Sequence, residues 1–452
     1  MENVDVKIPK RILNNLLSAL SAGVVPRVGA PYIAIGRTDE ISALLSMMDG
    51  VSDGGAAVRF LIGRYGSGKS FLIQLIRGYA LERGFLCADA DLSTDQRRLC
   101  GGNGAGLATY RELMKNLASK ASPDGGALPV VLARHYASVL LELSKDNVMP
   151  EHPEFRSLLR RRILSDFSLL EGSVGGFDFA RVISEYFLAY ADENEEVKSA
   201  CLCWLRGEFA NKTEAKAQLG FAVSTVIDDE NWYDFIKLWS LLSRRIGYAG
   251  LFVYIDECII LYKIVNRVSR ESNYEKILTI FNDTLQGRAE GLGVIFGGTP
   301  QFLEDTRRGL FSYEALRSRL TDSRFADVGF KTFSSPVIRL RRLSDNELYA
   351  LLTRLGKLYA AQSGSSAMLT DEENKTFLTH CLSLAGADEM ITPREIIRDY
   401  LTLLNILRDN PDATFEKVLK AKRAEGDGKA PTPKAEETAR KASAVSLSDI
   451  EF

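Results

Sequence analysis

The sequence predicts an α/β protein in which a parallel sheet forms the core, a long helical insertion interrupts it, and a helical lid follows it. Short apolar segments alternate with segments of helical periodicity along the chain. These short segments are apolar throughout, which is typical of parallel strands covered on both faces. The chain from about 128 to 246 is almost wholly helical and lies between two of them. Helical segments from residue 345 to about 421 follow the last one, and we expect these to form the lid.

The expected strands are residues 56–63, 85–93, 250–257, 291–300 and 335–344. Apolar residues at helical spacing predict a helix over 7–21, ahead of the first strand. The segment "IAIG" is a short apolar strand or turn that leads into a helix, and Thr38 or Asp39 is expected to cap that helix. A helix over 70–84 follows the first strand. After the second strand, a glycine-rich loop precedes a helix that starts near Thr109.

Length and composition indicate a globular protein of two or three structural units, with 452 residues. The formal net charge is −2, from 57 basic and 59 acidic residues, which argues against a histone-like binder of nucleic acid. The six cysteines lack the spacing of a disulfide framework or a zinc site. The N-terminus has no apolar signal core, and no apolar run reaches the roughly 18 residues of a membrane helix. We therefore expect a cytoplasmic protein without a membrane span.

A glycine-rich loop, "GRYGSGKS", matches the phosphate-binding pattern G-x-x-x-x-G-K-[ST] between an expected strand and an expected helix. Gly66 and Gly68 allow backbone angles that turn successive N–H groups inward and form a nest for an anion. The dipole of the following helix favours negative charge at the same place. Lys69 is expected to contact the β- and γ-phosphates, and the Ser70 hydroxyl to bind Mg²⁺. The residues expected to bind the nucleotide here are Gly63, Arg64, Tyr65, Gly66, Ser67, Gly68, Lys69, Ser70 and Phe71.

Two acidic residues follow the apolar strand "LFVYI". Asp256 at the strand end is expected to orient the hydrated magnesium ion. Glu257 is expected to act as the general base on the water that attacks the γ-phosphate. The strand "GVIFGGT" ends in Thr299, whose hydroxyl is expected to hydrogen-bond the γ-phosphate or that water. The alternative for each is an ordinary turn after a strand.

Arginines are expected to complete the site, because a guanidinium stabilises charge that is spread over phosphate oxygens. The segment "YEALRSRL" carries Arg317 and Arg319 on a helical stretch before the last strand. Either is a candidate arginine finger supplied to a neighbouring subunit. The segment "MITPREII" places Arg394 near the start of a helix, from which it is expected to reach the γ-phosphate of its own subunit. The alternative for each is a surface arginine paired with a carboxylate.

In this order the motifs resemble those of AAA+ ATPases of the origin-recognition and STAND-like branch. The segment "IAIGRTDE", with Gly36, Arg37 and Glu40, resembles the GR-x-x-E box beside the adenine, and Val25 and Pro26 would pack on the base. The resemblance implies an additional-strand P-loop core with the strand order 5-1-4-3-2. It also implies the roles of sensor 1, arginine finger and sensor 2 for, respectively, Thr299, Arg319 and Arg394.

More closely, "RFLIGRYGSGKSFLIQLIR", "ERGFLCADADLS" and "GLATYRELMKNLA" resemble the BrxD ATP-binding proteins of BREX-type phage-defence systems, over roughly residues 7–420. This resemblance implies a bacterial cytoplasmic ATPase that uses ATP and Mg²⁺ and acts on DNA beside a helicase-like partner. It implies a nucleotide-dependent homo-oligomer as well. About 26 residues separate Arg394 from the expected tail, too few for the DNA-gripping winged helix of many origin-recognition relatives.

We expect five segments, because the insertion divides the core into two parts. The five segments are the adenine-pocket segment with the first part of the core at 1–110, the helical insertion at 111–248, the second part of the core at 249–343, the helical lid at 344–422 and a disordered tail at 423–452.

The insertion carries basic and aromatic residues that admit two interpretations. In the first, Arg160, Arg161 and Arg162 on one helix and Arg244 and Arg245 at the end of another contact phosphates, with Trp204, Trp232 and Trp239 as possible stacking residues. A solvated helix face over buried aromatics is the favoured interpretation, because the surrounding helices are also rich in acids. The insertion would serve equally as a protein-docking platform, and the C-terminal "SLSDIEF" is either a partner-docking tip or an end without function.

The motifs predict ATP hydrolysis, and the resemblance implies that this hydrolysis is coupled to assembly or remodelling on DNA in phage defence. The alternative is a nucleotide-dependent switch or scaffold that binds a partner with negligible turnover. The intact pair Asp256–Glu257 favours hydrolysis, since a pure switch has less need of a general base. A signalling ATPase of the STAND kind ranks last, because the chain has no large sensor repeat.

Overall fold

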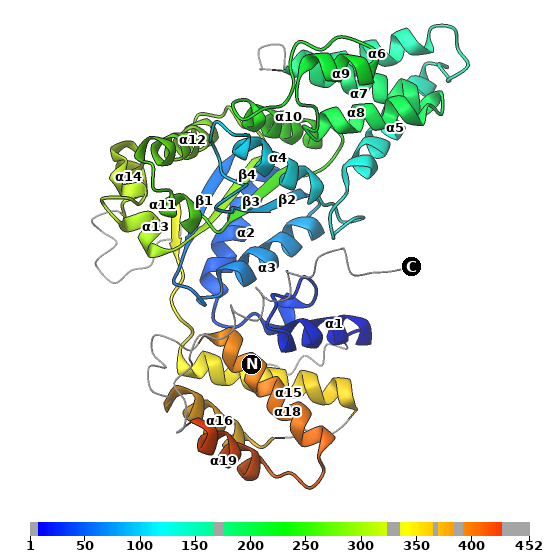
Figure 1. Ribbon diagram of the computed structural model, residues 1–452. Coiled ribbons are helices and arrows are strands. Elements are labelled where there is room, and N and C mark those ends of the chain that lie inside the picture. Colours follow the sequence, from blue (N-terminus) through cyan, green and yellow to red (C-terminus); the bar gives the residue numbers. More distant parts are fainter. Residues whose placement is uncertain (1–7, 167–174, 323–334, 365–368, 384–391, 427–452) are drawn as a thin grey trace, which may run out of the picture.

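The structure is a computed structural model that describes residues 8–166, 175–322, 335–364, 369–383 and 392–426 (Figure 1). The predicted tail lies outside the described residues from 427 onward, while helix α19, Phe415–Gly426, covers its first four positions.

The core is one five-stranded sheet in which every strand pairing is parallel. Its strands are β1 Ala57–Ile62, β2 Leu86–Asp91, β3 Leu251–Asp256, β4 Leu292–Gly298 and β5 Val337–Arg339. Their order is β2-β3-β4-β1-β5, which is the order that the resemblance implied. Every residue of β3 and β4 is buried, as the unbroken apolar sequences predicted. The last strand is shorter than expected, since the chain leaves the sheet before Arg341 and Arg342, which are exposed.

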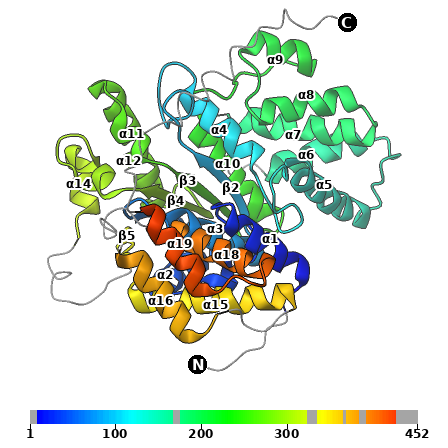
Figure 2. The same ribbon diagram turned by 60° about the horizontal axis from the view of Figure 1, so that its bottom comes forward.

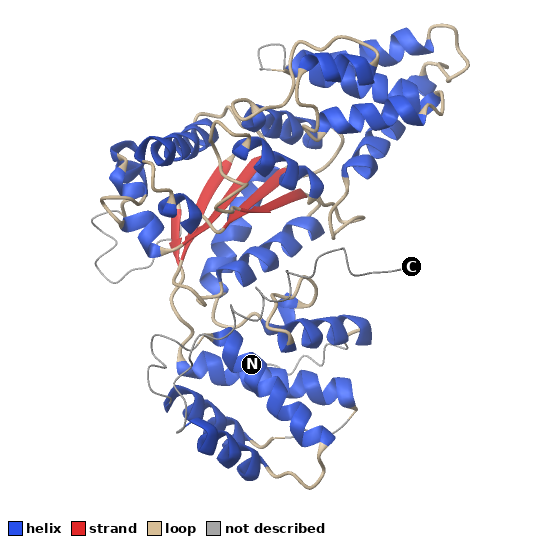
Figure 3. Cartoon of the chain, viewed as in Figure 1, coloured by secondary structure: helices blue, strands red, loops and turns tan. Residues whose placement is uncertain are grey.

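Helices cover both faces of the sheet (Figure 3). Helices α2, Thr38–Ser52, and α3, Lys69–Glu82, bury one face. Helices α4 Ala105–Lys115, α10 Trp232–Arg245 and α12 Arg267–Leu285 bury the other. The short helices of the core are α11 Ile259–Lys263, α13 Pro300–Glu304, η3 Leu310–Ser312 and α14 Glu314–Leu320, and η1 Ala30–Ile33 precedes α2. The α/β prediction is therefore confirmed.

Two predicted helix starts were wrong. Helix α4 begins at Ala105, four residues before Thr109, because the carboxylate of Asp229 accepts hydrogen bonds from the N–H groups of Gly104 and Leu107 at 3.1 and 2.9 Å. That carboxylate comes from a distant segment, so the local sequence carries no sign of it. Helix α2 begins at Thr38 without any side-chain cap, so neither Thr38 nor Asp39 caps it.

The insertion is helical, as predicted, and it projects from the sheet beyond α10 (Figure 1). Its outer helices are α5 Leu128–Lys145, α6 Phe155–Asp166, α7 Gly176–Ala191, α8 Glu195–Leu205 and α9 Lys212–Leu219. The three tryptophans Trp204, Trp232 and Trp239 are each 1% exposed, so they cannot stack on bases. Arg160 pairs with Glu185 at 2.7 Å on the surface. These contacts favour a solvated helix face over buried aromatics.

The lid contains α15 Asp345–Ser363, α16 Asp371–Ser383, α18 Pro393–Asp409 and α19. Helix α1, Lys10–Ser21, lies beside α15 and α18, although the predicted boundaries assign it to the first part of the core (Figure 2). Its leucine stripe of Leu13, Leu16, Leu17 and Leu20 is buried in the same apolar cluster as the lid helices. Helix α1 and the lid helices thus share one small apolar core. Within the described residues, no helix has the length and apolar character needed to cross a membrane.

The start of α15 is stabilised by a capping box and an ion pair. Ser344 and Glu347 cap each other's backbone N–H groups. Both terminal nitrogens of Arg341, Nη1 and Nη2, also donate to the Glu347 carboxylate, and these bonds hold its pKa at about 2, below the ordinary 4.5. A carboxylate whose pKa is lower in the folded than in the unfolded protein stabilises the fold at a pH above the unfolded-state pKa. This stabilisation is lost as the pH falls through the folded-state pKa.

The substitution Glu347→Gln is therefore expected to destabilise the protein most above about pH 5, with the effect shrinking toward about pH 2. Thermal denaturation of the wild type and the variant across this range measures the difference. Glu372→Gln is the matched control, because Glu372 pairs with Lys375 on an exposed helix face. A Glu347→Gln effect that does not depend on pH would contradict the prediction.

Candidate functional site

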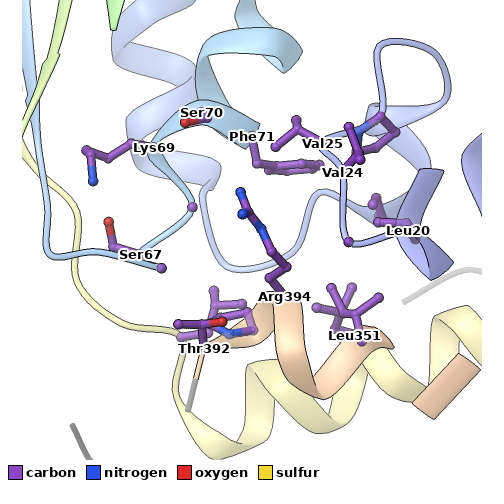
Figure 4. Close-up of a pocket in the computed structure, with 18 of the residues that line it drawn as sticks. Leu20, Val24, Val25, Ser67, Lys69, Ser70, Phe71, Leu351, Thr392 and Arg394 are labelled. Carbon is purple, nitrogen blue, oxygen red and sulfur yellow. The ribbon is translucent and has the colours of Figure 1, made fainter. Parts of the chain in front are cut away.

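A cavity lies between the carboxyl edge of the sheet and the lid (Figure 4). The core contributes the loop between β1 and α3 together with Glu257. The lid contributes residues from α15 and α18, and the segment 23–37 closes a third side. Segments that are more than 300 positions apart in the sequence therefore line one space.

The loop at 63–70 has the geometry of an anion nest. Gly66 and Gly68 have φ values of 74° and 87°, which lie in the left-handed region that favours glycine. Gly68 is the N-cap residue of α3, so the first N–H groups of this helix are directed to the same place. The hydroxyl of Ser67 is buried and has no hydrogen-bond partner among the described residues. An anionic oxygen would satisfy these donors.

Lys69 is folded back onto the loop. Its Nζ donates to the carbonyl oxygens of Gly63 and Arg64 at 3.0 and 3.1 Å. Burial lowers the pKa of Lys69, while the carboxylates of Asp256 and Glu257 raise it. Because the ammonium rests on neutral carbonyls, a phosphate in the nest would offer it a stronger, charged acceptor.

Ser70 and Asp256 meet although they are 186 positions apart in the sequence. The Ser70 hydroxyl donates to Asp256 Oδ2 at 2.7 Å, and the Glu257 N–H donates to Oδ1 at 2.8 Å. Gly297 on β4 makes room for this carboxylate, since a Cβ there would lie 2.2 Å from Asp256 Oδ1. A hydroxyl beside a carboxylate at the mouth of an anion nest suits Mg²⁺, which prefers oxygen ligands.

Glu257 has an unusual backbone conformation. Its φ is 57°, which is uncommon for a residue with a side chain. The residue is exposed and lines the cavity beside Lys69 and Ser70. The left-handed turn thus ends the strand and places this carboxylate at the site. Such outliers often occur at functional positions.

Asp91 is a carboxylate that the sequence analysis did not single out. It ends β2, pairs in register with Asp256 and lines an adjoining cavity with Ser70 and Glu257. The residue is accessible to solvent, yet desolvation by its surroundings and then the charge of Asp256 raise its pKa to about 6. Asp91 and Asp256 are both acidic residues at the end of a strand, and this shared feature was the signal that could have identified Asp91.

Three arginines, Arg317, Arg319 and Arg394, were expected to complete the site, and of these only Arg394 lines the cavity. It extends from the start of α18 into this space (Figure 4), and its guanidinium has no ion-pair partner in the described part of the chain. Arg319 on α14 is exposed and donates to the Ala315 carbonyl at 2.7 Å. Arg317 is also exposed and pairs with Glu314 at 2.8 Å. The structure does not bring either α14 arginine to the cavity of its own chain.

Thr299 directly follows β4 and caps α13. Its hydroxyl accepts a hydrogen bond from the Phe302 N–H at 3.4 Å. This places it at the same edge of the sheet as Asp256, although it does not line either cavity described above.

Many side chains that line the cavity are apolar, and in Figure 4 Leu20, Val24, Val25 and Leu351 lie on the side away from Lys69. The apolar lining residues are Leu20, Val24, Val25, Pro26, Ile33, Ile35, Phe71, Leu343, Leu351 and Ile397. Val25 lies beside Phe71 in Figure 4, so the expected base-packing segment faces the residue that follows the phosphate loop. An apolar slot next to an anion nest suits a flat base joined to phosphates.

Arg37 lines the cavity, whereas Gly36, the predicted residue before it, does not. Arg37 is 5% exposed, and burial lowers its pKa. Its guanidinium bonds to main-chain oxygens of Ser67 and Arg341 and to the Glu40 carboxylate. The side chain of Arg37, which was predicted to lie beside the base, is therefore already bonded to other groups of the protein.

Thr392 is a second contact that sequence reasoning missed. It caps α18 and packs on Gly66, where a Cβ would lie 2.3 Å from Thr392 Cγ2. The capping-box pattern T-P-R-E was the signal for its helix start, but only the tertiary structure brings it to the loop.

Comparison with known proteins gives one family. A family model described as "BREX system ATP-binding protein BrxC/D" matches residues 8–423. No curated protein matches the chain.

Proposed function

The chain belongs to the family of BREX system ATP-binding proteins BrxC/D, and we propose that it is an AAA+ ATPase that hydrolyses ATP in the cavity between core and lid. Membership implies ATP binding and a role in phage defence. The observation that carries hydrolysis is the bond between Ser70 and Asp256 at the mouth of the anion nest, with Glu257 beside it.

The phosphates are proposed to occupy the nest of Gly66 and Gly68, with the base in the apolar slot. Lys69 then leaves its two carbonyl acceptors and binds the β- and γ-phosphate oxygens. Ser70 and Asp256 would hold Mg²⁺, which would neutralise charge on these oxygens. Supporting this assignment, the nest, the hydroxyl and the carboxylate lie within one short stretch of the sheet edge.

Glu257 is proposed to take a proton from water as the water oxygen attacks the γ-phosphorus. The bond from that phosphorus to the bridging oxygen of ADP breaks, and phosphate leaves. Arg394 stabilises charge on the γ-phosphate from the lid, and Thr299 orients the water from the end of β4. Arg394 enters this assignment because its guanidinium extends into the cavity.

Arg319 is proposed to act as the arginine finger in the site of a neighbouring subunit, with Arg317 as the alternative. Both side chains are exposed, and neither lines the cavity of its own chain. ATP would then be enclosed fully only in a nucleotide-dependent homo-oligomer. The energy of hydrolysis is proposed to drive assembly or remodelling on DNA with a helicase-like partner, in the cytoplasm of a bacterium.

Phosphate release with and without single- and double-stranded DNA tests this function, together with the particle mass in ATP. We expect turnover that rises several-fold with DNA, and a larger particle when ATP is present. Arg319→Ala is expected to retain ATP binding and lose turnover. Arg267→Ala is the matched control, because Arg267 is an exposed arginine that pairs with Glu271 on α12. A monomer that binds ATP but releases no phosphate under any condition would favour a nucleotide-dependent scaffold.

A further inference from the structure

Two chain segments connect the core to the lid. The first is residues 22–37, which join α1 in the lid to α2 in the core. The second is residues 340–344, which join β5 in the core to α15 in the lid. Any change in the angle between lid and core must be absorbed by these two segments, which we call the hinge.

Arg37 bonds both hinge segments to the phosphate loop. It ends the first segment, and its Nη2 donates to the Arg341 carbonyl of the second segment at 2.6 Å. The same nitrogen donates to the Ser67 carbonyl of the phosphate loop at 2.9 Å. Glu40, one turn into α2, accepts from Nη1 at 3.3 Å and neutralises the buried charge.

The lid side of this junction is equally constrained. Arg341 also binds Glu347 through its side chain, and Glu347 caps the first helix of the lid. Gly36 packs directly against this carboxylate, because a Cβ at Gly36 would lie 2.5 Å from Glu347 Oε1. The buried guanidinium of Arg37 thus joins the phosphate loop to both hinge segments, and the side chain of Arg341 continues this connection to the lid.

From these contacts we infer that Arg37 is a positioning residue, which sets the lid angle and the phosphate-loop conformation together and so pre-forms the nucleotide site. The inference rests on the proposed binding of ATP in this cavity. Without Arg37, the chain samples more lid angles, and only part of the population has the site assembled. The apparent affinity for ATP falls in proportion to the fraction of molecules in which the site is assembled, whereas the bound, closed state is unchanged.

Lysine is the informative replacement at this position. It keeps the positive charge beside Glu40, but its single ammonium lacks the planar fork with which arginine reaches several acceptors. Losing one hydrogen bond from a charged group is expected to weaken the apparent affinity for ATP by about tenfold. Arg77→Lys is a matched control, since Arg77 is also 5% exposed and bonds one carboxylate, Asp89, and one carbonyl, that of Pro123.

The test measures ATP turnover against ATP concentration for the wild type, Arg37→Lys and Arg77→Lys. We expect Arg37→Lys to raise KM about tenfold with kcat within about twofold, and Arg77→Lys to change neither. Without nucleotide, trypsin is expected to cut after the exposed Arg27 of the first hinge segment faster in Arg37→Lys than in the other two proteins.

Equal KM values for the two lysine variants, or a loss confined to kcat, would overturn the inference. So would equal rates of cleavage after Arg27. If the wild type neither bound nor hydrolysed ATP, the proposed function would be wrong. The trypsin experiment, which is done without nucleotide, would still test whether Arg37 holds the hinge.

Discussion

Replacing Glu257 with glutamine is expected to lower ATP turnover by about 10²- to 10⁴-fold while ATP binding is retained. Glutamine has nearly the same size but cannot accept the proton of the attacking water. Lys69, Ser70 and Asp256, which are proposed to bind the phosphates and Mg²⁺, are untouched by this change. Phosphate release gives the turnover, and titration with a fluorescent ATP analogue gives the affinity.

Glu290→Gln is the control for this substitution. Glu290 precedes β4 at the opposite edge of the sheet and pairs with Arg244, so its loss should leave turnover unchanged. Wild-type turnover in Glu257→Gln would show that another group accepts the proton. Asp91 would then be the next residue to replace, because its raised pKa of about 6 and its position near Glu257 suit that role.

Replacing Lys69 with alanine is expected to weaken ATP binding by about 10- to 100-fold, the effect of losing hydrogen bonds from one charged group. The ammonium lies on the carbonyls of Gly63 and Arg64, within the loop that forms the nest. Titration with the same ATP analogue measures the loss, and thermal denaturation checks that the variant is folded.

Lys120→Ala serves as the control, since Lys120 pairs with Glu82 on the surface. Unchanged affinity in Lys69→Ala would mean that the phosphates bind elsewhere, and the cavity between core and lid would lose its assignment.

The local sequence was sufficient for the strands, most helices and the phosphate loop. Apolar runs predicted the buried strands because side chains on both faces of a parallel sheet must avoid water. The pattern around Gly66 and Gly68 predicted an anion nest because few residues other than glycine adopt positive φ. The strand order followed from the resemblance, since nothing in the strands themselves specifies their neighbours.

Tertiary structure alone decided which distant residues act together. The leucines of α1 predicted a helix with one apolar face, but many apolar surfaces would cover that face, and in the structure the lid does so. Arg37 had the sequence context of a base contact, but nothing in the sequence indicated its bonds to two carbonyl oxygens of other segments, because every residue carries a carbonyl and no motif distinguishes it. The start of α4 depended in the same way on the carboxylate of Asp229. A sequence determines its own periodicity and backbone preferences, whereas the partner of a buried charge or an apolar face is determined only when the chain has packed.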